Sequence, residues 1–448
     1  MRPYVNVIGA GLAGCEAAWQ ALKAGVDVRL YEMKPKKYTP AHHSPAFAEL
    51  VCSNSFRSDA LSNAIGLLKA EMVKLDSLIM NEAYRCRVPA GSALAVDRTV
   101  FSEGVTDKLK NMPGITVIEE ELGGVPDDSV TVIATGPLTS DKMADYIRDG
   151  LGWGGLHFFD AAAPIVDAST VDETIAYRAS RYGKGDADYV NCPMNESEYL
   201  AFYDALLHAE CAELKEFDRE DQKDLTVFEG CMPVEVMAAR GINTLRYGPL
   251  KPVGLPDPRT GKDPYAVVQL RKENVEGTMF NLVGFQTHLT FAEQRRVFRM
   301  IPGLSQAEFL RYGVMHRNTF LQSPGKQTET YALASDPHIF FAGQMTGVEG
   351  YIESAGSGLV AGLNAARTAL GLSPVVFPKE TMIGAMAHYV SHGGIGPFQP
   401  MNANFGIVTP LDRKVKGGKA VRNEAISARA LSLIDEKIRA MEAERKGS

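Results

Sequence analysis

Long apolar runs are absent from this sequence of 448 residues. No run approaches the roughly 18 consecutive apolar residues that a membrane-spanning helix needs, so we expect no membrane-embedded segment. The first residues are typical of a strand rather than of a signal or transit peptide. We therefore expect a cytoplasmic protein without a membrane partner.

Cysteine is scarce and scattered, and no two cysteines form a Cys-x-x-Cys pair. The six are Cys15, Cys52, Cys86, Cys192, Cys211 and Cys231. This spacing matches neither a disulfide framework nor a zinc site, so we expect no bound metal.

An excess of positive charge is also missing, since the net charge is −7. No global field favours RNA or anionic membranes, and any nucleic-acid surface must be local. The best local candidate is segment 413–422, with a lesser one at 34–37. The cations concerned are Arg413, Lys414, Lys416, Lys419, Arg422, Lys34, Lys36 and Lys37. On charge alone, a solvated surface face explains these segments better than a binding site does.

The first informative pattern in the sequence is that of a dinucleotide-binding unit. The apolar run 5–8 predicts a strand, Gly9-Ala10-Gly11-Leu12-Ala13-Gly14 a Gly-x-Gly-x-x-Gly turn, and 15–23 a helix. A second strand over 26–32 ends in Glu32. The glycines allow a tight turn and close approach of a pyrophosphate, and Glu32 can accept hydrogen bonds from ribose hydroxyls.

A second cofactor signature lies far along the chain. A strand over 339–341 runs into Ala342-Gly343-Gln344, and a helix rich in small residues follows over 353–366. An Ala-Thr-Gly that includes Thr135 and Gly136 ends another predicted strand. Two signatures on either side of a long insertion favour FAD over NAD. The cofactor-binding candidates are Gly9, Ala10, Gly11, Leu12, Ala13, Gly14, Glu32, Met33, Thr135, Gly136, Gly343, Gln344, Gly350, Ser354, Ala355, Gly356 and Gly358.

The fold class that follows is α/β, with an FAD-binding Rossmann-like domain of the glutathione-reductase type interrupted by a smaller α+β domain. Alternating segments such as 266–271 and 279–285 predict an antiparallel sheet in the insertion. We expect the FAD-binding domain over 1–185 and 313–448, the latter with a carboxyl-terminal extension, and the insertion over 186–312. Further helices are predicted over 61–84, 99–111, 196–224 and 422–445.

Two cysteines and a histidine are candidates for chemistry. Cys52 lies in a long loop, 34–58, five residues before Arg57, and nearby cations favour a thiolate. Cys231 and His288 lie in the insertion. From these residues alone, an ordinary buried thiol explains Cys52 as well as a catalytic role does. For Cys231 the ordinary buried thiol is a somewhat better explanation than catalysis, and a structural role for His288 is similarly favoured.

The sequence resembles one family, the folate- and FAD-dependent tRNA uracil-5-methyltransferases (TrmFO), relatives of the GidA-type tRNA-modifying flavoproteins. The resemblance rests on strings spread over nearly the whole chain. They include Val7–Gly14, Ala48–Ser55, Asp160–Val166, Glu229–Pro233, Val283–Leu289, Tyr312–Thr319 and Met401–Gly406.

The resemblance implies transfer of a one-carbon unit from 5,10-methylenetetrahydrofolate to carbon 5 of the T-loop uridine of tRNA, with FAD as cofactor and NADH or NADPH as reductant. Tetrahydrofolate would be released, and no obligate protein partner is implied. Carbon 5 of uracil becomes nucleophilic once a thiolate adds at carbon 6. The family pattern gives that role to Cys231 and a second catalytic role to Cys52. We also expect that His288 lines the folate pocket and stacks on the pterin, because aromatic faces favour such contacts, and that Arg57 contacts substrate.

Other functions remain open at this point. The same chemistry could act on a uridine of 23S ribosomal RNA. A GidA-like wobble-uridine enzyme would be longer than this chain. A flavin oxidoreductase of small molecules would leave both cysteines unused, and a non-enzymatic RNA-binding protein would leave both signatures unexplained.

Overall fold

The structure is a computed structural model that describes residues 2–447 except 127–128, 154, 162, 184–185, 213–231, 275–276, 314, 395–397, 399 and 413–414. Of residues 155–161, 315–319 and 445–447 it describes the backbone alone.

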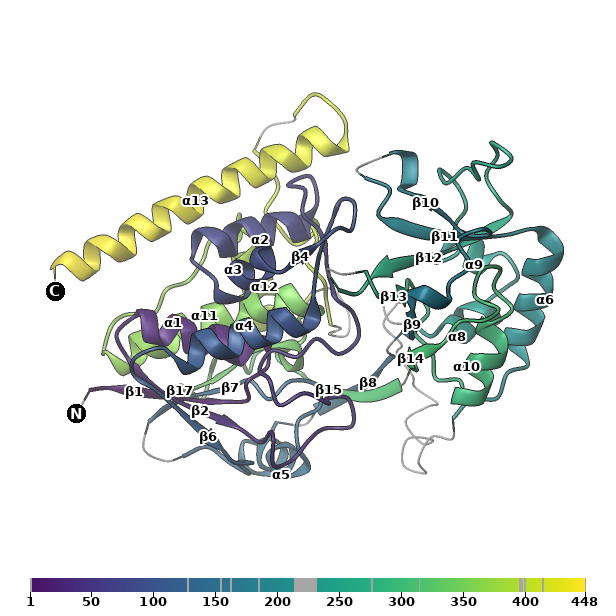
Figure 1. Ribbon diagram of the computed structural model, residues 1–448. Coiled ribbons are helices and arrows are strands. Elements are labelled where there is room, and N and C mark those ends of the chain that lie inside the picture. The colour runs from purple at the N-terminus through teal and green to yellow at the C-terminus, as the bar shows by residue number, and fades with distance from the viewer. Residues whose placement is uncertain are drawn as a thin grey trace.

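A six-stranded sheet forms the base of the larger domain (Figure 1). Its strands, in spatial order, are β16 (Ala332–Leu333), β17 (Asp336–Phe341), β7 (Val130–Ile133), β1 (Tyr4–Ile8), β2 (Asp27–Glu32) and β6 (Ile115–Glu119). All pairs are parallel except β16 with β17. The central strands β1 and β7 are apolar and almost fully buried, as expected for a parallel sheet covered on both faces. The predicted Rossmann-like fold is confirmed.

Helices cover one face of this sheet in several layers (Figure 1). They are α1 (Leu12–Lys23), α2 (Ala64–Lys74), α3 (Leu78–Arg85), α4 (Arg98–Lys110), α11 (Tyr351–Ala369), α12 (Met382–His392) and α13 (Lys419–Gly447). The short α5 (Asp141–Asp145) lies at the other face, followed by a π-helical turn, Tyr146–Gly150. The core is formed by the sheet together with α1 and α11, and α2, α3, α4, α12 and α13 also contribute buried side chains to it.

The single helix predicted over 61–84 is wrong. The chain forms α2 and α3, and Asp76 between them has a φ of 56°, which an α-helix cannot contain. Ser77 then caps α3 by accepting a hydrogen bond from the Met80 N–H. The apolar spacing continues across the break because both helices pack on the same core.

The smaller domain contains a second six-stranded sheet, antiparallel throughout. Its order is β10 (Tyr177–Ala179), β11 (Tyr189–Met194), β12 (Ala266–Lys272), β13 (Met279–Leu282), β9 (Ile165–Asp167) and β14 (Phe309–Arg311). Helices α6 (Glu196–Leu207), α8 (Val234–Ala239), α9 (Thr244–Tyr247) and α10 (Phe291–Phe298) accompany it. Part of the helix predicted over 196–224 lies outside the described residues.

Two antiparallel strands, β8 (Gly155–Ala161) and β15 (Met315–Leu321), connect the domains. Strands β9 and β10 belong to the second sheet although they precede residue 186, the boundary expected from the sequence. We propose that the insertion extends from the end of β8 to the start of β15. A three-stranded sheet consists of β3 (Ser55–Ser58), β5 (Ala93–Val96) and β4 (Arg87–Val88). Short 3-10 turns span Ala168–Thr170, Arg181–Gly183 and Gln344–Thr346.

Within the part of the chain that the structure describes, no helix combines the length and apolar character needed to cross a membrane.

Candidate active site

A cavity opens in the larger domain where β1, β7 and β17 end and α1 and α11 begin. Ligands of open α/β sheets bind at this edge, beyond the carboxyl ends of the strands. Residues from both predicted signatures line it. Those among the cofactor candidates are Gly9, Ala10, Gly11, Leu12, Ala13, Glu32, Met33, Thr135, Gly136, Gly343, Gln344 and Ser354.

The first glycine turn is shaped for close approach of a ligand. Gly9 has a φ of +97°, and a Cβ there would lie 2.6 Å from the Ala134 carbonyl oxygen. Gly11 precedes α1, and a Cβ there would meet no atom within 4 Å, so the backbone is open toward the cavity. Unpaired N–H groups at a helix start favour a phosphate.

Glu32, at the tip of β2, is buried beside this turn. Its carboxylate accepts hydrogen bonds from the Ala10 N–H at 2.8 Å and the Lys34 N–H at 3.0 Å. These bonds fix the side chain at the cavity wall, and a carboxylate has further acceptor sites for ribose hydroxyls. The adjacent His42 also lines the cavity, and burial, followed by Lys34, lowers its pKa.

Five of the cofactor candidates do not line the cavity: Gly14, Gly350, Ala355, Gly356 and Gly358. Two of them allow close packing of backbones. A Cβ on Gly14 would lie 1.8 Å from the Gly9 carbonyl oxygen, and one on Gly358 would lie 2.2 Å from the Ala13 carbonyl oxygen. Gly14 therefore lets α1 pack closely against the turn after β1, and Gly358 lets α11 pack closely against α1.

These features fit FAD. Two helix N-termini, two glycine turns and a buried acid converge on one cavity, and the space beside Gly11 is free of protein atoms within 4 Å of a Cβ position. The N-terminus of α11 supplies a positive dipole end of the kind that stabilises charge on a reduced flavin.

Cys52 lines the same cavity and contacts Tyr351, the first residue of α11. The Cys52 Sγ lies 2.9 Å from the Tyr351 Oη. The same oxygen accepts hydrogen bonds from the N–H groups of Cys52 at 2.8 Å and Ser53 at 3.2 Å. The sequence predicted a cofactor signature around Tyr351 but did not identify this tyrosine.

Three arginines surround the loop that carries Cys52. Arg98 donates to the carbonyl oxygens of Leu50 at 2.8 Å and Val51 at 2.9 Å and pairs with Glu273. Arg271, from β12, donates to the Ser53 Oγ at 2.9 Å and to the Asn54 Oδ1. Burial, followed by the charge of Arg98, lowers the pKa of the Arg311 guanidinium to about 10. The insertion domain thus supplies cations to a loop of the larger domain.

Arg57, a candidate substrate contact, lies outside the cavity lining. Its guanidinium pairs with the buried Glu353 and donates to the Asn402 Oδ1 at 3.0 Å. Glu353 also accepts a hydrogen bond from the Ala403 N–H. Arg57 therefore anchors segment 402–403 against the start of α11, while its side chain remains 41% exposed.

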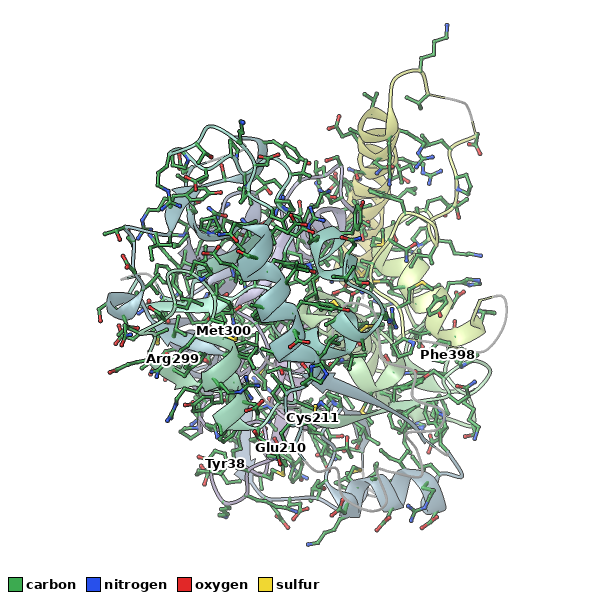
Figure 2. The ribbon with its side chains drawn as sticks, turned by 90° about the vertical axis from the view of Figure 1, so that its right-hand side faces the viewer. Tyr38, Glu210, Cys211, Arg299, Met300 and Phe398 are labelled. Atoms are coloured by element: carbon green, nitrogen blue, oxygen red, sulfur yellow. The ribbon has the colours of Figure 1, made fainter. Side chains whose placement is uncertain are left out.

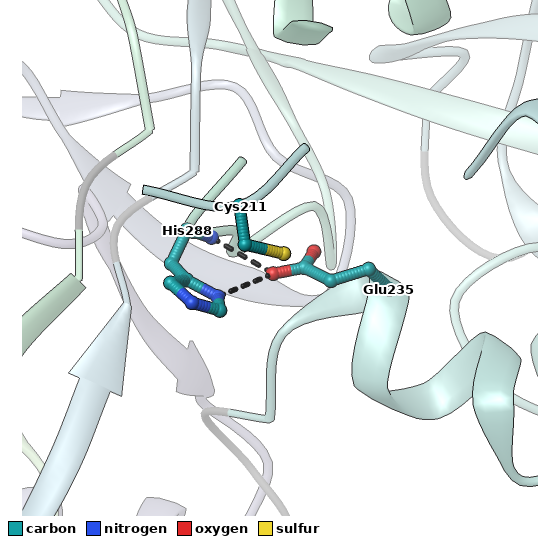
Figure 3. A group of neighbouring side chains, drawn as sticks. All are labelled: Cys211, Glu235 and His288. Carbon is teal, nitrogen blue, oxygen red and sulfur yellow. Dashed lines mark hydrogen bonds and ion pairs between the residues drawn. The ribbon is translucent and has the colours of Figure 1, made fainter. Parts of the chain in front are cut away.

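His288 belongs to a second cluster, in the insertion domain (Figure 3). Its Nδ1 lies 3.1 Å and its backbone N–H 2.9 Å from the Glu235 Oε1. The hydrogen bond to Cys211, and then the one to Glu235, raises the pKa of His288 to about 9. Figure 2, which views the molecule from the insertion-domain side, labels Cys211 beside Glu210.

The Cys211–Glu235–His288 cluster and a second group, Glu329, His388 and His392, have the composition of metal sites. Hydrogen bonds within each group already join its members: the His388 Nδ1, for example, lies 2.6 Å from the Glu329 Oε1.

Comparison with known proteins finds relatives that match nearly the whole chain. The sequence model described as glucose inhibited division protein A, GIDA, matches residues 4–373. A protein of Acetivibrio thermocellus named methylenetetrahydrofolate--tRNA-(uracil-5-)-methyltransferase TrmFO is 60% identical over 436 residues, which are 97% of this chain and 99% of that protein. A protein of the same name from Lacticaseibacillus paracasei is 59% identical over 96% of each chain.

The chain belongs to the TrmFO family. Among solved structures, Aquifex aeolicus GidA in its form II crystal superimposes with a TM-score of 0.70 at 16% identity, covering 97% of this chain and 73% of that one. This likeness concerns the fold.

Three of the predicted site residues lie outside the described residues: Cys231, Arg413 and Lys414. The chain is described again from Met232, and the Val234 N–H donates to the Gln286 carbonyl oxygen at 2.8 Å. The start of α8 is thereby held next to the segment that carries His288.

The expectation that Lys34 contacts RNA on the surface is wrong. Lys34 is buried, lines the cavity, and donates to the Ala46 and Ser44 carbonyl oxygens at 2.6 and 3.1 Å. Lys36 and Lys37 are exposed, but Lys36 donates to the Glu119 carbonyl oxygen and Lys37 pairs with Glu121 at 2.6 Å. Lys416, Lys419 and Arg422 are exposed near the start of α13.

Sequence reasoning missed several residues of this TrmFO-family site. Lys34 was predicted for a different role, and His42 could have been suspected, because the long loop 34–58 was expected to be functional. Glu235 and Cys211 gave no signal, because they meet His288 only through the fold of the insertion.

Proposed function

We propose that this chain is an FAD- and folate-dependent methyltransferase that converts a tRNA uridine to 5-methyluridine. The observation that carries the proposal is a cavity fit for FAD with a cysteine in its wall, in a chain 60% identical over nearly its full length to a protein named for this reaction. The one-carbon donor is 5,10-methylenetetrahydrofolate, and the cellular site is the cytoplasm.

The finer assignments are the T-loop uridine as the target and NADH or NADPH as the reductant. Both rest on the family resemblance. Bound FAD would supply the redox chemistry and a carrier for the one-carbon unit. Because a stacked base cannot reach the cavity, the uridine must turn out of the RNA stack.

The chain's own residues have distinct roles in this proposal. Gly9, Gly11 and the helix starts hold the pyrophosphate, and Glu32 holds a ribose. Cys231 adds to carbon 6 of uracil and makes carbon 5 nucleophilic, and it leaves at the end of the reaction. Cys52, in the cavity wall, is placed to exchange a proton near the reacting atoms. His288 packs against the folate through its ring face.

The tRNA contacts are assigned by charge and exposure. Lys416, Lys419 and Arg422 are exposed cations on one short stretch, and they are the described residues best placed to meet phosphates. Lys36 and Lys37 remain secondary candidates, because both already have partners on the protein.

The test is a methylation assay with purified, flavin-loaded protein and a tRNA transcript. Label from methylene-labelled folate should enter 5-methyluridine, and label from S-adenosylmethionine should not. Omission of folate should abolish the product. Incorporation from S-adenosylmethionine, or none from folate, would refute the proposal.

Analysis of two RNA species distinguishes the tRNA target from the ribosomal RNA target. In a strain lacking the gene, loss of 5-methyluridine from tRNA supports the proposal, whereas loss from 23S ribosomal RNA supports the same chemistry on another substrate. A GidA-like wobble modification is disfavoured because the chain is 60% identical over 99% of a protein named for uracil-5 methylation of tRNA.

A further inference from the structure

The contact between Cys52 and Tyr351 fixes the direction of a hydrogen bond. A phenol oxygen has one proton to donate and two lone pairs with which to accept. The N–H groups of Cys52 and Ser53 point at the Tyr351 Oη, at 2.8 and 3.2 Å, and occupy its acceptor capacity. A thiol proton directed at the same oxygen would have no lone pair left to bind.

The Tyr351 proton must therefore point elsewhere. The Cys52 Sγ, 2.9 Å from the Tyr351 Oη, is the partner available for it. Sulfur accepts a short hydrogen bond well when it carries the negative charge of a thiolate. We infer that Tyr351 donates its hydroxyl hydrogen bond to Cys52 and thereby holds Cys52 as a thiolate at neutral pH.

The raised pKa of Tyr351 is consistent with its hydroxyl being the donor to Cys52. Burial, followed by the neighbouring charge of Cys52, raises the pKa of the Tyr351 hydroxyl well above its usual range. The phenol therefore keeps its proton under conditions in which a thiol loses one, and the negative charge of the pair resides on sulfur.

The surrounding charges favour the same state. Arg98 bonds to the Val51 carbonyl next to Cys52, and Arg311 interacts electrostatically with both Cys52 and Tyr351. Glu273 pairs with Arg98 and offsets one cation. Among the described residues, the buried Nε and Nη2 of Arg311 have no hydrogen-bond partner.

Charged residues on two further neighbouring elements, α11 and β12, have partners on the protein. On α11, Glu353 is paired with Arg57, and on β12, Arg271 donates to Ser53 and Asn54. On the loop of Cys52 itself, Glu49 pairs with Lys34 at 3.7 Å. Among the described residues, the arginines near Cys52 therefore outnumber the glutamates paired with them, and nearby cations lower the pKa of a thiol. Tyr351 acts through Cys52 and is a positioning residue. The inference concerns a protonation state and does not depend on the identity of the substrate.

The test is the pH dependence of alkylation of Cys52 in the full-length, flavin-loaded protein. Iodoacetamide reacts with the thiolate, and mass spectrometry of the peptide that contains Cys52 gives its rate at each pH. In the wild type, the midpoint should lie below about pH 7, well under the value of about 8.5 for a free cysteine. The buried Cys15 and Cys192 serve as internal references that should remain unreactive.

Tyr351→Phe keeps the ring and removes the donor. The midpoint should rise by about one pH unit, which lowers the alkylation rate about tenfold at pH values well below the wild-type midpoint. Tyr177→Phe is the matched control, because it removes a hydroxyl that donates to the Leu255 carbonyl at 2.6 Å in the other domain, and it should leave the profile unchanged. Flavin content and thermal unfolding report the integrity of each variant.

Two results would overturn the inference. One is an unchanged or lower midpoint in folded Tyr351→Phe. The other, which needs no variant, is a wild-type midpoint above about pH 7, because Cys52 would then be mostly protonated at neutral pH. Either outcome leaves the proposed methyltransferase function standing, because that function is read from product formation.

Discussion

The reactivity of each cysteine in this chain depends on the atoms around its sulfur. Burial raises the pKa of Cys86 to about 11 and that of Cys192 to about 12, so these sulfurs remain protonated. Cys15 is fully buried, and its Sγ lies 3.3 Å from the Ala10 carbonyl oxygen. Cys52 instead lies against a phenol and near arginines. The spacing of cysteines in the sequence could not reveal this difference.

Cys231→Ala should abolish methylation, because no other group would prime carbon 5 of the uracil. Flavin absorbance per protein should stay at the wild-type level, since the cavity residues are unchanged. Product is measured as 5-methyluridine after digestion of the tRNA. Cys86→Ala, at a buried cysteine outside the cavity lining, is the matched control. A fully active, flavin-loaded Cys231→Ala protein would rule out the assignment.

The stabilising effect of His288 should depend on pH. Because its pKa is raised from 6.5 to about 9, the imidazolium stabilises the fold fully below about pH 6.5, and this contribution is lost as pH rises through 9. The difference in unfolding free energy between wild type and His288→Gln should therefore narrow over this range by about 1–3 kcal/mol.

Urea unfolding at several pH values measures that difference. The control is His338→Gln, at a histidine whose side chain is 65% exposed. A stability difference for His288→Gln that stays constant between pH 6.5 and 9 would show that the cluster does not hold a raised imidazole pKa.

At the scale of helices and strands, periodicity predicted the long elements and missed the short ones. The β1–α1–β2 unit and α11 appear where the glycine patterns and apolar runs placed them. Strands β9 and β10 have three residues each, too few for an alternating pattern to be recognised. The break between α2 and α3 depends on one left-handed residue, Asp76, which the apolar spacing conceals.

The close contact between α1 and α11 can be tested by alanine substitutions at two neighbouring glycines of α11. A Cβ on Gly358 would lie 2.2 Å from a backbone oxygen of α1, whereas one on Gly356 would lie 3.5 Å from a flexible leucine side chain. Gly358→Ala should separate the helices, cost about 1–3 kcal/mol or more, and reduce flavin content several-fold.

Gly356→Ala carries the same chemical change on the same helix and should retain its flavin. Absorbance of purified protein and thermal unfolding report both variants. Equal flavin content and stability in the two variants would contradict the packing described here.

At the scale of the whole molecule, the site is assembled from segments far apart in the sequence. Cys52 and Tyr351 are separated by 299 positions, and arginines from the insertion complete the surroundings of Cys52. The sequence predicted that both signatures meet one cofactor, because that follows from the fold class. It could not predict which side chains meet, because those contacts depend on how the insertion packs on the larger domain.

The net charge of −7 makes tRNA binding depend on local cations. Reversal of Lys416, Lys419 and Arg422 to glutamate should weaken tRNA affinity at least tenfold and flatten its dependence on salt, since fewer counterions are released. Reversal of three exposed cations elsewhere, Arg2, Arg240 and Lys262, changes the net charge equally and serves as the control. Filter binding over a salt series measures both. Equal losses in the two triple variants would show that only net charge matters.

The most direct test of the whole account follows the hydrogen atoms of the transferred carbon. The purified protein is given 5,10-methylenetetrahydrofolate with two deuterium atoms on the methylene, together with reductant and tRNA in ordinary water. The account predicts 5-methyluridine about two mass units heavier than the unlabelled nucleoside, because the methylene keeps both deuterons and gains one ordinary hydride. A product of unchanged mass, with its methyl group from another donor, would contradict it.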